Sequence, residues 1–144
     1  MNEKEKDILE KVIKLSKERA YIIDSLDSQN GEPIGGGIYS LDKIELRSEE
    51  QAANQKLWDY LLSLSDEELL MVGTMMLVGR DGDRGGNMER MEMYRTNERI
   101  FRGIMSERDG AINYLTGKKP LGEYLEEGMR ECHGLPYKKQ HPRD

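Results

Sequence analysis

Apolar residues recur at helical spacing in the N-terminal part of the chain. In DILEKVIKLSKERAYIIDSL (7–26), apolar side chains occupy positions 8, 12, 15, 22 and 26, and others stand beside them. Steps of three or four residues put such side chains on one face of a helix, so the pattern predicts a long amphipathic helix over 1–27. The stretch that follows, DSQNGEPIGGG, is rich in Gly, Pro, Asn and Ser and predicts a flexible connector over 28–46.

Two capping-box sequences predict where the next helices begin. Ser48 is followed three residues later by Gln51, and Ser65 by Glu68. In each box the serine side chain accepts from a backbone amide while the Gln or Glu reaches back to the serine amide. Two boxes so close together predict an antiparallel hairpin of the second and third helices.

The third predicted helix, 66–79, is apolar nearly all round its circumference. A helix of this kind in a water-soluble domain lies at the centre of a bundle, so we expect it to form the core. A fourth helix is expected to open at Asn87 or a neighbouring Gly. Gly117 in a left-handed conformation should end a fifth helix, and Pro120 should start the sixth.

These elements predict an all-α fold with six helices in one domain over 1–134. The core helices fall in 47–134, and no Val, Ile and Thr alternation indicates a sheet. The residues after them, 135–144, carry a small basic cluster near prolines and predict a disordered tail.

The charge and the cysteine content argue against a nucleic-acid-binding, membrane-bound or secreted protein. The chain has 22 basic and 28 acidic residues, and a net charge of −6 repels nucleic acid and anionic lipid surfaces. Its single cysteine, Cys132, suits a reducing compartment, and the N-terminus shows no signal-peptide pattern. The longest apolar stretch, 69–78, reaches half of the roughly 20 residues that a membrane-spanning helix needs. We therefore expect a cytoplasmic protein.

Three segments resemble the bacterial family called domain of unknown function 3775, over about 57–134. They are LLSLSDEELLMVGTMMLVGRDGD, INYLTGKKPLGEY and YLEEGM. The chain departs from the family's Pro-Leu-Leu step at Gly122. The resemblance implies a compact helical fold and no assigned activity.

The segment DGDRGGNMERME (81–92) has the spacing of a calcium-binding loop. Asp81, Asp83 and Glu92 stand at ligand positions one, three and twelve, and Gly86 stands at the sharp turn. Position five is Gly85, which offers no side-chain ligand, and no second loop pairs with this one. The alternative is a turn whose acids cap the following helix.

Paired glutamates suggest a second metal chemistry. Glu89 with Glu92, and Glu123 with Glu126, each place two carboxylates on one helical face, as in helical nucleotide phosphohydrolases that use Mg²⁺. In a chain this rich in acids the same spacing also arises on solvated helix faces.

Arg80, at the end of the buried helix, is a candidate ligand-binding residue together with Tyr124. A pocket arginine there would bind a small phosphate or carboxylate. The structural alternative, which the sequence favours, is an ion pair between Arg80 and Glu126 or Glu127.

These patterns favour a non-catalytic protein-binding module whose partner is another protein, of the inhibitor or adaptor type. A phage product directed against a host system is one example. Nine methionines fit either adaptable binding surfaces or core gaps. No cofactor is required; calcium or magnesium enters only with the metal-site alternatives. A homodimer is also compatible with the sequence.

Overall fold

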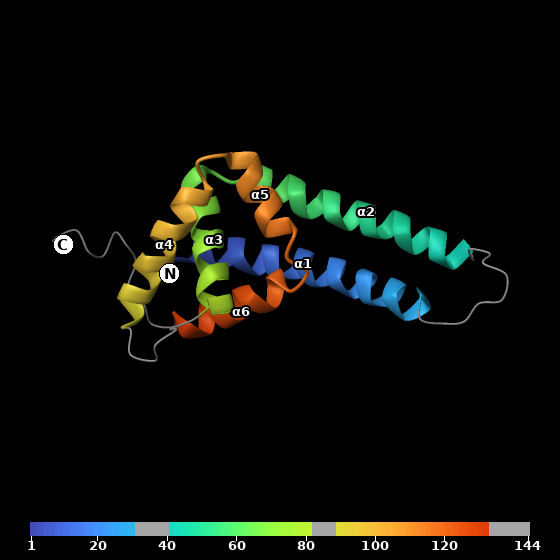
Figure 1. Ribbon diagram of the computed structural model, residues 1–144, viewed down its shortest axis with the longest axis horizontal. Coiled ribbons are helices and arrows are strands. Elements are labelled where there is room, and N and C mark those ends of the chain that lie inside the picture. Colours follow the sequence, from blue (N-terminus) through green and yellow to red (C-terminus); the bar gives the residue numbers. More distant parts are fainter. Residues whose placement is uncertain (31–40, 82–88, 133–144) are drawn as a thin grey trace.

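The computed structural model describes residues 1–30, 41–81 and 89–132. Over these ranges the chain forms six helices in the order seen in Figure 1. They are α1 (Glu3–Asn30), α2 (Leu41–Leu62), α3 (Asp66–Asp81), α4 (Arg90–Ile104), α5 (Arg108–Thr116) and α6 (Leu121–Glu131). The prediction of an all-α fold with six helices is confirmed.

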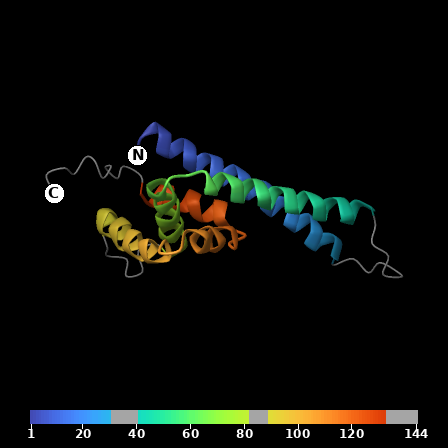
Figure 2. The same ribbon diagram turned by 90° about the horizontal axis from the view of Figure 1, so that it is seen from above.

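α1 and α2 lie side by side as a long antiparallel pair that projects beyond the other four helices (Figure 1, Figure 2). Both helices bury apolar side chains at steps of three to four residues. The buried apolar side chains are Ile8, Leu9, Val12, Leu15 and Leu26 on α1, with Ala53, Leu57 and Leu61 on α2. Two such stripes facing each other exclude water from the seam, which stabilises both helices.

The boundaries predicted for the connector, 28 and 46, are both wrong. α1 continues to Asn30, and α2 already begins at Leu41. The segment LDKIELR (41–47) contains no Gly or Pro, so no helix-breaking residue prevents α2 from beginning at Leu41. Ser48 therefore lies inside α2 and does not cap its N-terminus.

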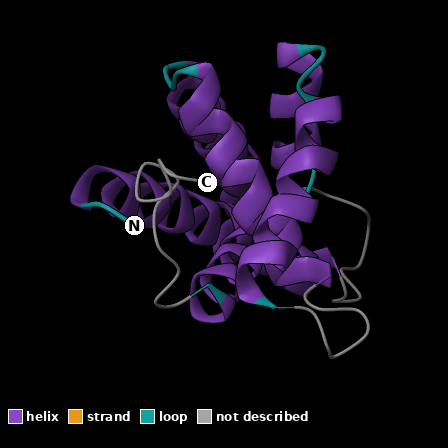
Figure 3. Ribbon diagram, turned by 90° about the vertical axis from the view of Figure 1, so that its left-hand side faces the viewer, coloured by secondary structure: helices purple, strands orange, loops and turns teal. Residues whose placement is uncertain are grey.

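α3 is the centre of the molecule, as its composition predicts. Every residue from Leu69 to Val78 is buried. α3 packs chiefly against α6 and α4, whereas α2 packs against α1, so the predicted α2–α3 hairpin is wrong. The apolar stripe of α2 is already covered by α1, and α3 leaves the end of α2 at a steep angle (Figure 2). Figure 3 shows the resulting arrangement of helices and loops, with no strand in the part of the chain that the structure describes.

Glycines allow the closest helix crossings. A Cβ atom added at Gly79 of α3 would lie 1.7 Å from the backbone oxygen of Tyr124, and one added at Gly128 of α6 would lie 2.1 Å from the backbone oxygen of Met75. α3 and α6 therefore touch backbone to backbone. On another side of α3, Gly73 receives the buried ring of Phe101 from α4.

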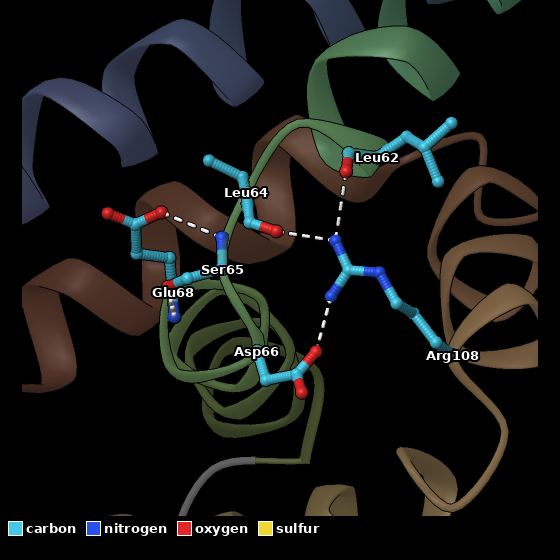
Figure 4. Close-up of polar contacts among 6 residues, drawn as sticks. All are labelled: Leu62, Leu64, Ser65, Asp66, Glu68 and Arg108. Carbon is cyan, nitrogen blue, oxygen red and sulfur yellow. Dashed lines mark hydrogen bonds and ion pairs between the residues drawn. The ribbon is translucent and has the colours of Figure 1, made fainter.

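The turn between α2 and α3 is held by two sets of polar contacts (Figure 4). The Glu68 carboxylate accepts from the Ser65 amide at 2.9 Å, and the Glu68 amide donates to the Ser65 hydroxyl at 3.1 Å, which confirms the predicted capping box. These bonds, the Ser65 amide first, lower the pKa of Glu68. Arg108 of α5 donates to the Asp66 carboxylate at 2.6 Å and to the backbone oxygens of Leu62 and Leu64. The guanidinium thus ties the start of α5 to this turn.

Other helix ends differ from the sequence predictions in detail. α4 begins at Arg90, with Glu89 extended before it. Gly117 ends α5 with φ −72°, a right-handed conformation, because the chain turns at once into the Lys118 to Leu121 hydrogen bond rather than into a left-handed cap. Pro120 directly precedes α6. The predicted tail over 135–144 lies outside the described residues.

Candidate functional site

A groove runs along the outer side of the α1–α2 pair. It has a volume of about 670 Å³, and most of its surface is apolar. We call it the α1–α2 groove and define it by the residues that line it: Lys14, Leu15, Lys17, Glu18, Tyr21 and Ile22 of α1, with Glu49, Ala52, Ala53 and Lys56 of α2.

The groove follows from the sizes of the side chains on α2. Ala52 and Ala53 stand where larger residues would fill the space beside the seam, so the surface is hollow there. Leu15 and Ile22 of α1 supply apolar wall, and Tyr21 stands at the rim with 74% of its surface exposed. An apolar groove of this form suits the packing of an additional helix.

Charged residues occupy the two ends of the groove. α1 and α2 are antiparallel (Figure 1). Lys14 precedes Tyr21 along α1 and Lys56 follows Glu49 along α2, so the two lysines share one end of the groove and Tyr21 and Glu49 share the other. The groove therefore has a basic end and an acidic, aromatic end. The sequence analysis did not single out these residues; adjacent alanines on α2 opposite an outward-facing tyrosine were the signal available.

On the opposite side of the seam, α1 is tied to the body by buried polar groups. Arg19, only 2% exposed, donates to the Asn54 side chain and to the backbone oxygens of Thr116 and Lys118. Burial lowers the pKa of the Arg19 guanidinium, and the charge of Glu50 opposes that effect. This side of the pair is thus covered by α5 and the turn that follows it, which leaves the α1–α2 groove as its open side.

Arg80 does not pair with the acids that the sequence suggested. Its guanidinium binds the carboxylate of Asp81 through two nitrogen atoms, at 3.1 Å each, and donates to the Tyr114 hydroxyl at 2.8 Å. These bonds, the one to Asp81 first, raise the pKa of Arg80. Glu126 instead pairs with Lys17 at 2.7 Å and Glu127 with Arg130 at 2.6 Å. Arg80 and Asp81 are neighbours in sequence, so their pair forms without the distant helix.

Tyr124, proposed with Arg80 as a ligand-binding residue, packs partly buried against the core. Its backbone oxygen faces Gly79 at the closest α3–α6 crossing. The two backbones therefore meet directly beside the position that the sequence assigned to a ligand.

The candidate metal ligands divide between described and undescribed residues. Asp83 and the loop 82–88 lie outside the described residues, so the calcium loop stays a prediction. Asp81 is held by Arg80, and Glu92 lies in the first turn of α4. Over the described ranges, His, Cys, Asp and Glu form no group of three or more that could hold a metal ion, so Glu89, Glu92, Glu123 and Glu126 do not meet as the phosphohydrolase alternative requires.

A second, more polar cleft lies between α2 and α5. It has a volume of about 420 Å³. Its lining consists of Trp58, Gly117, the hydroxyl of Thr116 and the side-chain amides of Asn54, Gln55 and Asn113. The buried Arg19 lies behind this cleft, since it binds both Asn54 and Thr116.

Cys132 is expected to react slowly with a thiol reagent in the folded protein. Burial, with a smaller effect of Glu131, raises the pKa of its thiol from 9.0 to about 11. At pH 8 the thiolate fraction is then roughly 100-fold below that of an exposed thiol, and only the thiolate reacts. Because Cys132 is the only cysteine, a disulfide reagent that releases a coloured product measures it alone.

The rate should rise as the pH approaches 11, and it should rise at pH 8 when urea unfolds the chain. The raised pKa also means that the stability contributed by the protonated thiol is present below about pH 9 and is lost as the pH passes through 11. Rapid reaction of the native protein at pH 8 would contradict the burial of this thiol.

Among the described helices, none is both long enough and apolar enough to span a bilayer. Comparison of the chain with protein-family models, with curated proteins and with solved structures gave no match. The resemblance to domain of unknown function 3775 over 57–134 therefore stays a prediction, and the α1–α2 groove is the feature on which a function can be argued.

Proposed function

We propose that this chain is a non-catalytic, cytoplasmic protein-binding module that receives a helix of its partner in the α1–α2 groove. The observation that carries the proposal is the groove itself: an apolar channel between two long helices, with Tyr21 exposed at its rim and lysines at one end. Grooves of this kind bind amphipathic helices through apolar side chains, and the flanking charges set the direction of the bound helix.

The side chains that would serve catalysis are engaged elsewhere, which supports a binding role. Arg80 is held by Asp81 and Tyr114, and Glu126 is held by Lys17. The Cys132 thiol is buried and protonated at neutral pH. Arg80 and Glu126 thus already have partners within the chain, and the Cys132 thiol is shielded from solvent.

A small-ligand role is a second candidate, favoured by the cleft between α2 and α5. Trp58 offers an aromatic face there, and Asn54 and Asn113 offer amides. This location differs from the Arg80 and Tyr124 site that the sequence suggested. The cleft is smaller and more polar than the α1–α2 groove, so we place it second.

The test is site-specific photo-crosslinking in the cells that make the protein. A benzophenone amino acid replaces Tyr21 at the rim of the groove. We expect a crosslinked species of defined mass whose second component is a polypeptide, identified by mass spectrometry of the joined peptides. The species should disappear when Ala52→Arg fills the groove.

Gln51→Arg is the matched control. Gln51 is exposed on α2 directly beside Ala52 but does not line the groove, so the same charge is added outside the binding surface. Both variants should keep the helical circular dichroism of the parent protein. Absence of any crosslink at Tyr21, or a crosslink that survives Ala52→Arg, would overturn the proposal.

A further inference from the structure

On each helix that lines the α1–α2 groove, two groups of different chemistry stand seven residues apart, one at each end of the groove. On α2, Glu49 and Lys56 stand seven residues apart, and Ala52 and Ala53 lie between them. Seven residues are about two helical turns, or roughly 10 Å, so both charges face the same way. On α1, Lys14 and Tyr21 are also seven residues apart on one face.

An antiparallel copy of the same surface would satisfy every one of these end groups. Rotation by a half-turn about an axis that passes between Ala52 and Ala53 brings Lys56 of each copy to Glu49 of the other. The same rotation brings Lys14 of each copy to the ring of Tyr21 of the other, a cation–π contact. Surfaces related in this way are self-complementary, because each contact occurs twice.

The small residues at the centre permit close approach. Ala52 is exposed and has no side chain beyond its Cβ, so two α2 helices can cross there without steric conflict. The groove supplies apolar surface on both sides of that crossing. Four helices, α1 and α2 from each copy, would then share one additional core.

From this pattern we infer that the helix received by the α1–α2 groove comes from a second copy of this chain, in a two-fold symmetric dimer. The inference rests on the proposed function and names its partner. A foreign acidic helix fits less well, because it would bring its carboxylates beside Glu18 and Glu49. Within the described residues, Lys14, Lys56 and Glu49 form no ion pair that a partner would have to break.

The groove spans only two to three helical turns per copy, so the dimer should be weak. We expect a dissociation constant in the micromolar range, because interfaces of modest area fall in that class. The dissociation constant should be measured at about 0.15 M salt. At that ionic strength the Debye length is ~8 Å, so the salt screens the general repulsion between two chains of net charge −6.

Charge exchange between Glu49 and Lys56 tests the inference by sedimentation equilibrium. Glu49→Lys alone places lysine against lysine at both ends of the dimer, and Lys56→Glu alone places glutamate against glutamate. Each single variant should raise the dissociation constant by roughly 10- to 30-fold. The double variant, with the charges exchanged, should return to within about threefold of the parent.

An equimolar mixture of the two single variants gives the sharpest result. In a mixed dimer, the lysine introduced by Glu49→Lys in one chain meets the glutamate introduced by Lys56→Glu in the other. At the opposite end the unchanged Lys56 of the first chain meets the unchanged Glu49 of the second, so both ends are complementary. The mixture should therefore dimerise more tightly than either variant does alone, with a dissociation constant close to that of the parent. A loss of folding in one variant cannot imitate this rescue, and circular dichroism of each variant checks the fold directly.

The outcomes separate this inference from the proposed function. A parent protein that stays monomeric at concentrations of roughly 0.5 mM, or a dimer that ignores the charge exchange, overturns the two-fold dimer. If the Tyr21 crosslink then joins a different polypeptide and is lost in Ala52→Arg, the binding module stands without the dimer. If Tyr21 crosslinks to nothing, both fail.

Discussion

Replacing Gly79 with alanine is expected to destabilise the protein by about 3 kcal/mol, and replacing Gly128 should have a similar effect. The added Cβ at Gly79 would lie 1.7 Å from the backbone oxygen of Tyr124, and at Gly128 it would lie 2.1 Å from the backbone oxygen of Met75. Both obstacles are backbone atoms of helices, so no side-chain rotation relieves the overlap. α3 and α6 must separate, and α3 carries the centre of the core. Urea unfolding followed by circular dichroism measures the loss.

Gly103→Ala is the matched control for these two variants. Gly103 lies near the end of α4, and a Cβ there meets nothing within 4 Å. Alanine has the higher helix propensity, so this variant should gain about 0.5 to 1 kcal/mol. If Gly79→Ala and Gly128→Ala behaved like Gly103→Ala, the close α3–α6 crossing would be wrong.

Replacing Arg19 with methionine is expected to cost about 3 kcal/mol, because methionine keeps much of the buried aliphatic volume but removes the donors to Thr116, Lys118 and Asn54. The two backbone oxygens stand at the end of α5 and just after it, where helix carbonyls lack partners within the helix. Leaving the Thr116 oxygen without its donor costs about 1 to 3 kcal/mol, whereas the Lys118 oxygen keeps the bond from the Leu121 amide. The same unfolding measurement applies.

Arg19→Lys separates the role of the charge from that of the hydrogen-bond geometry. An ammonium group keeps the charge but cannot reproduce the fork that binds Thr116 and Lys118 together. We therefore expect Arg19→Lys to remain destabilised, by about half as much as Arg19→Met. Burial of the guanidinium lowers its pKa and so opposes its charged form. If Arg19→Met were as stable as the wild-type protein, the cost of desolvating the guanidinium would equal the free energy gained from its hydrogen bonds. Arg19 would then not stabilise the fold.

Local chemistry explains which predictions succeeded. The Ser65 and Glu68 box needs only residues within one turn, and its bonds form as predicted. α3 is apolar on every side, which leaves the centre of the bundle as its only favourable position in water. The Ser48 box failed because its sequence is equally compatible with a helix interior, and only α1 as a packing partner favours that state.

The site predictions depended on distant contacts, and there the sequence was insufficient. Arg80 had several possible acidic partners, and it pairs with its sequence neighbour Asp81, whereas Glu126 pairs with Lys17 and Glu127 with Arg130. Glu123 and Glu126 share a helical face with each other but not a site with Glu89 and Glu92, because a periodicity along one helix carries no information about the position of another.

The sequence by itself determined the helical class, the central place of α3 and the capped turn before it, because these depend on periodicity and on bonds within one turn. Only the tertiary structure decided that α2 pairs with α1, that Arg19 is buried beneath α5, and that Ala52 and Ala53 leave a groove open. Those outcomes are set by which surfaces are covered by other helices. Which helix packs against a given surface depends on the whole folded chain. An apolar stripe or a small side chain could pack against any of several helices, and the sequence of that stripe does not specify which.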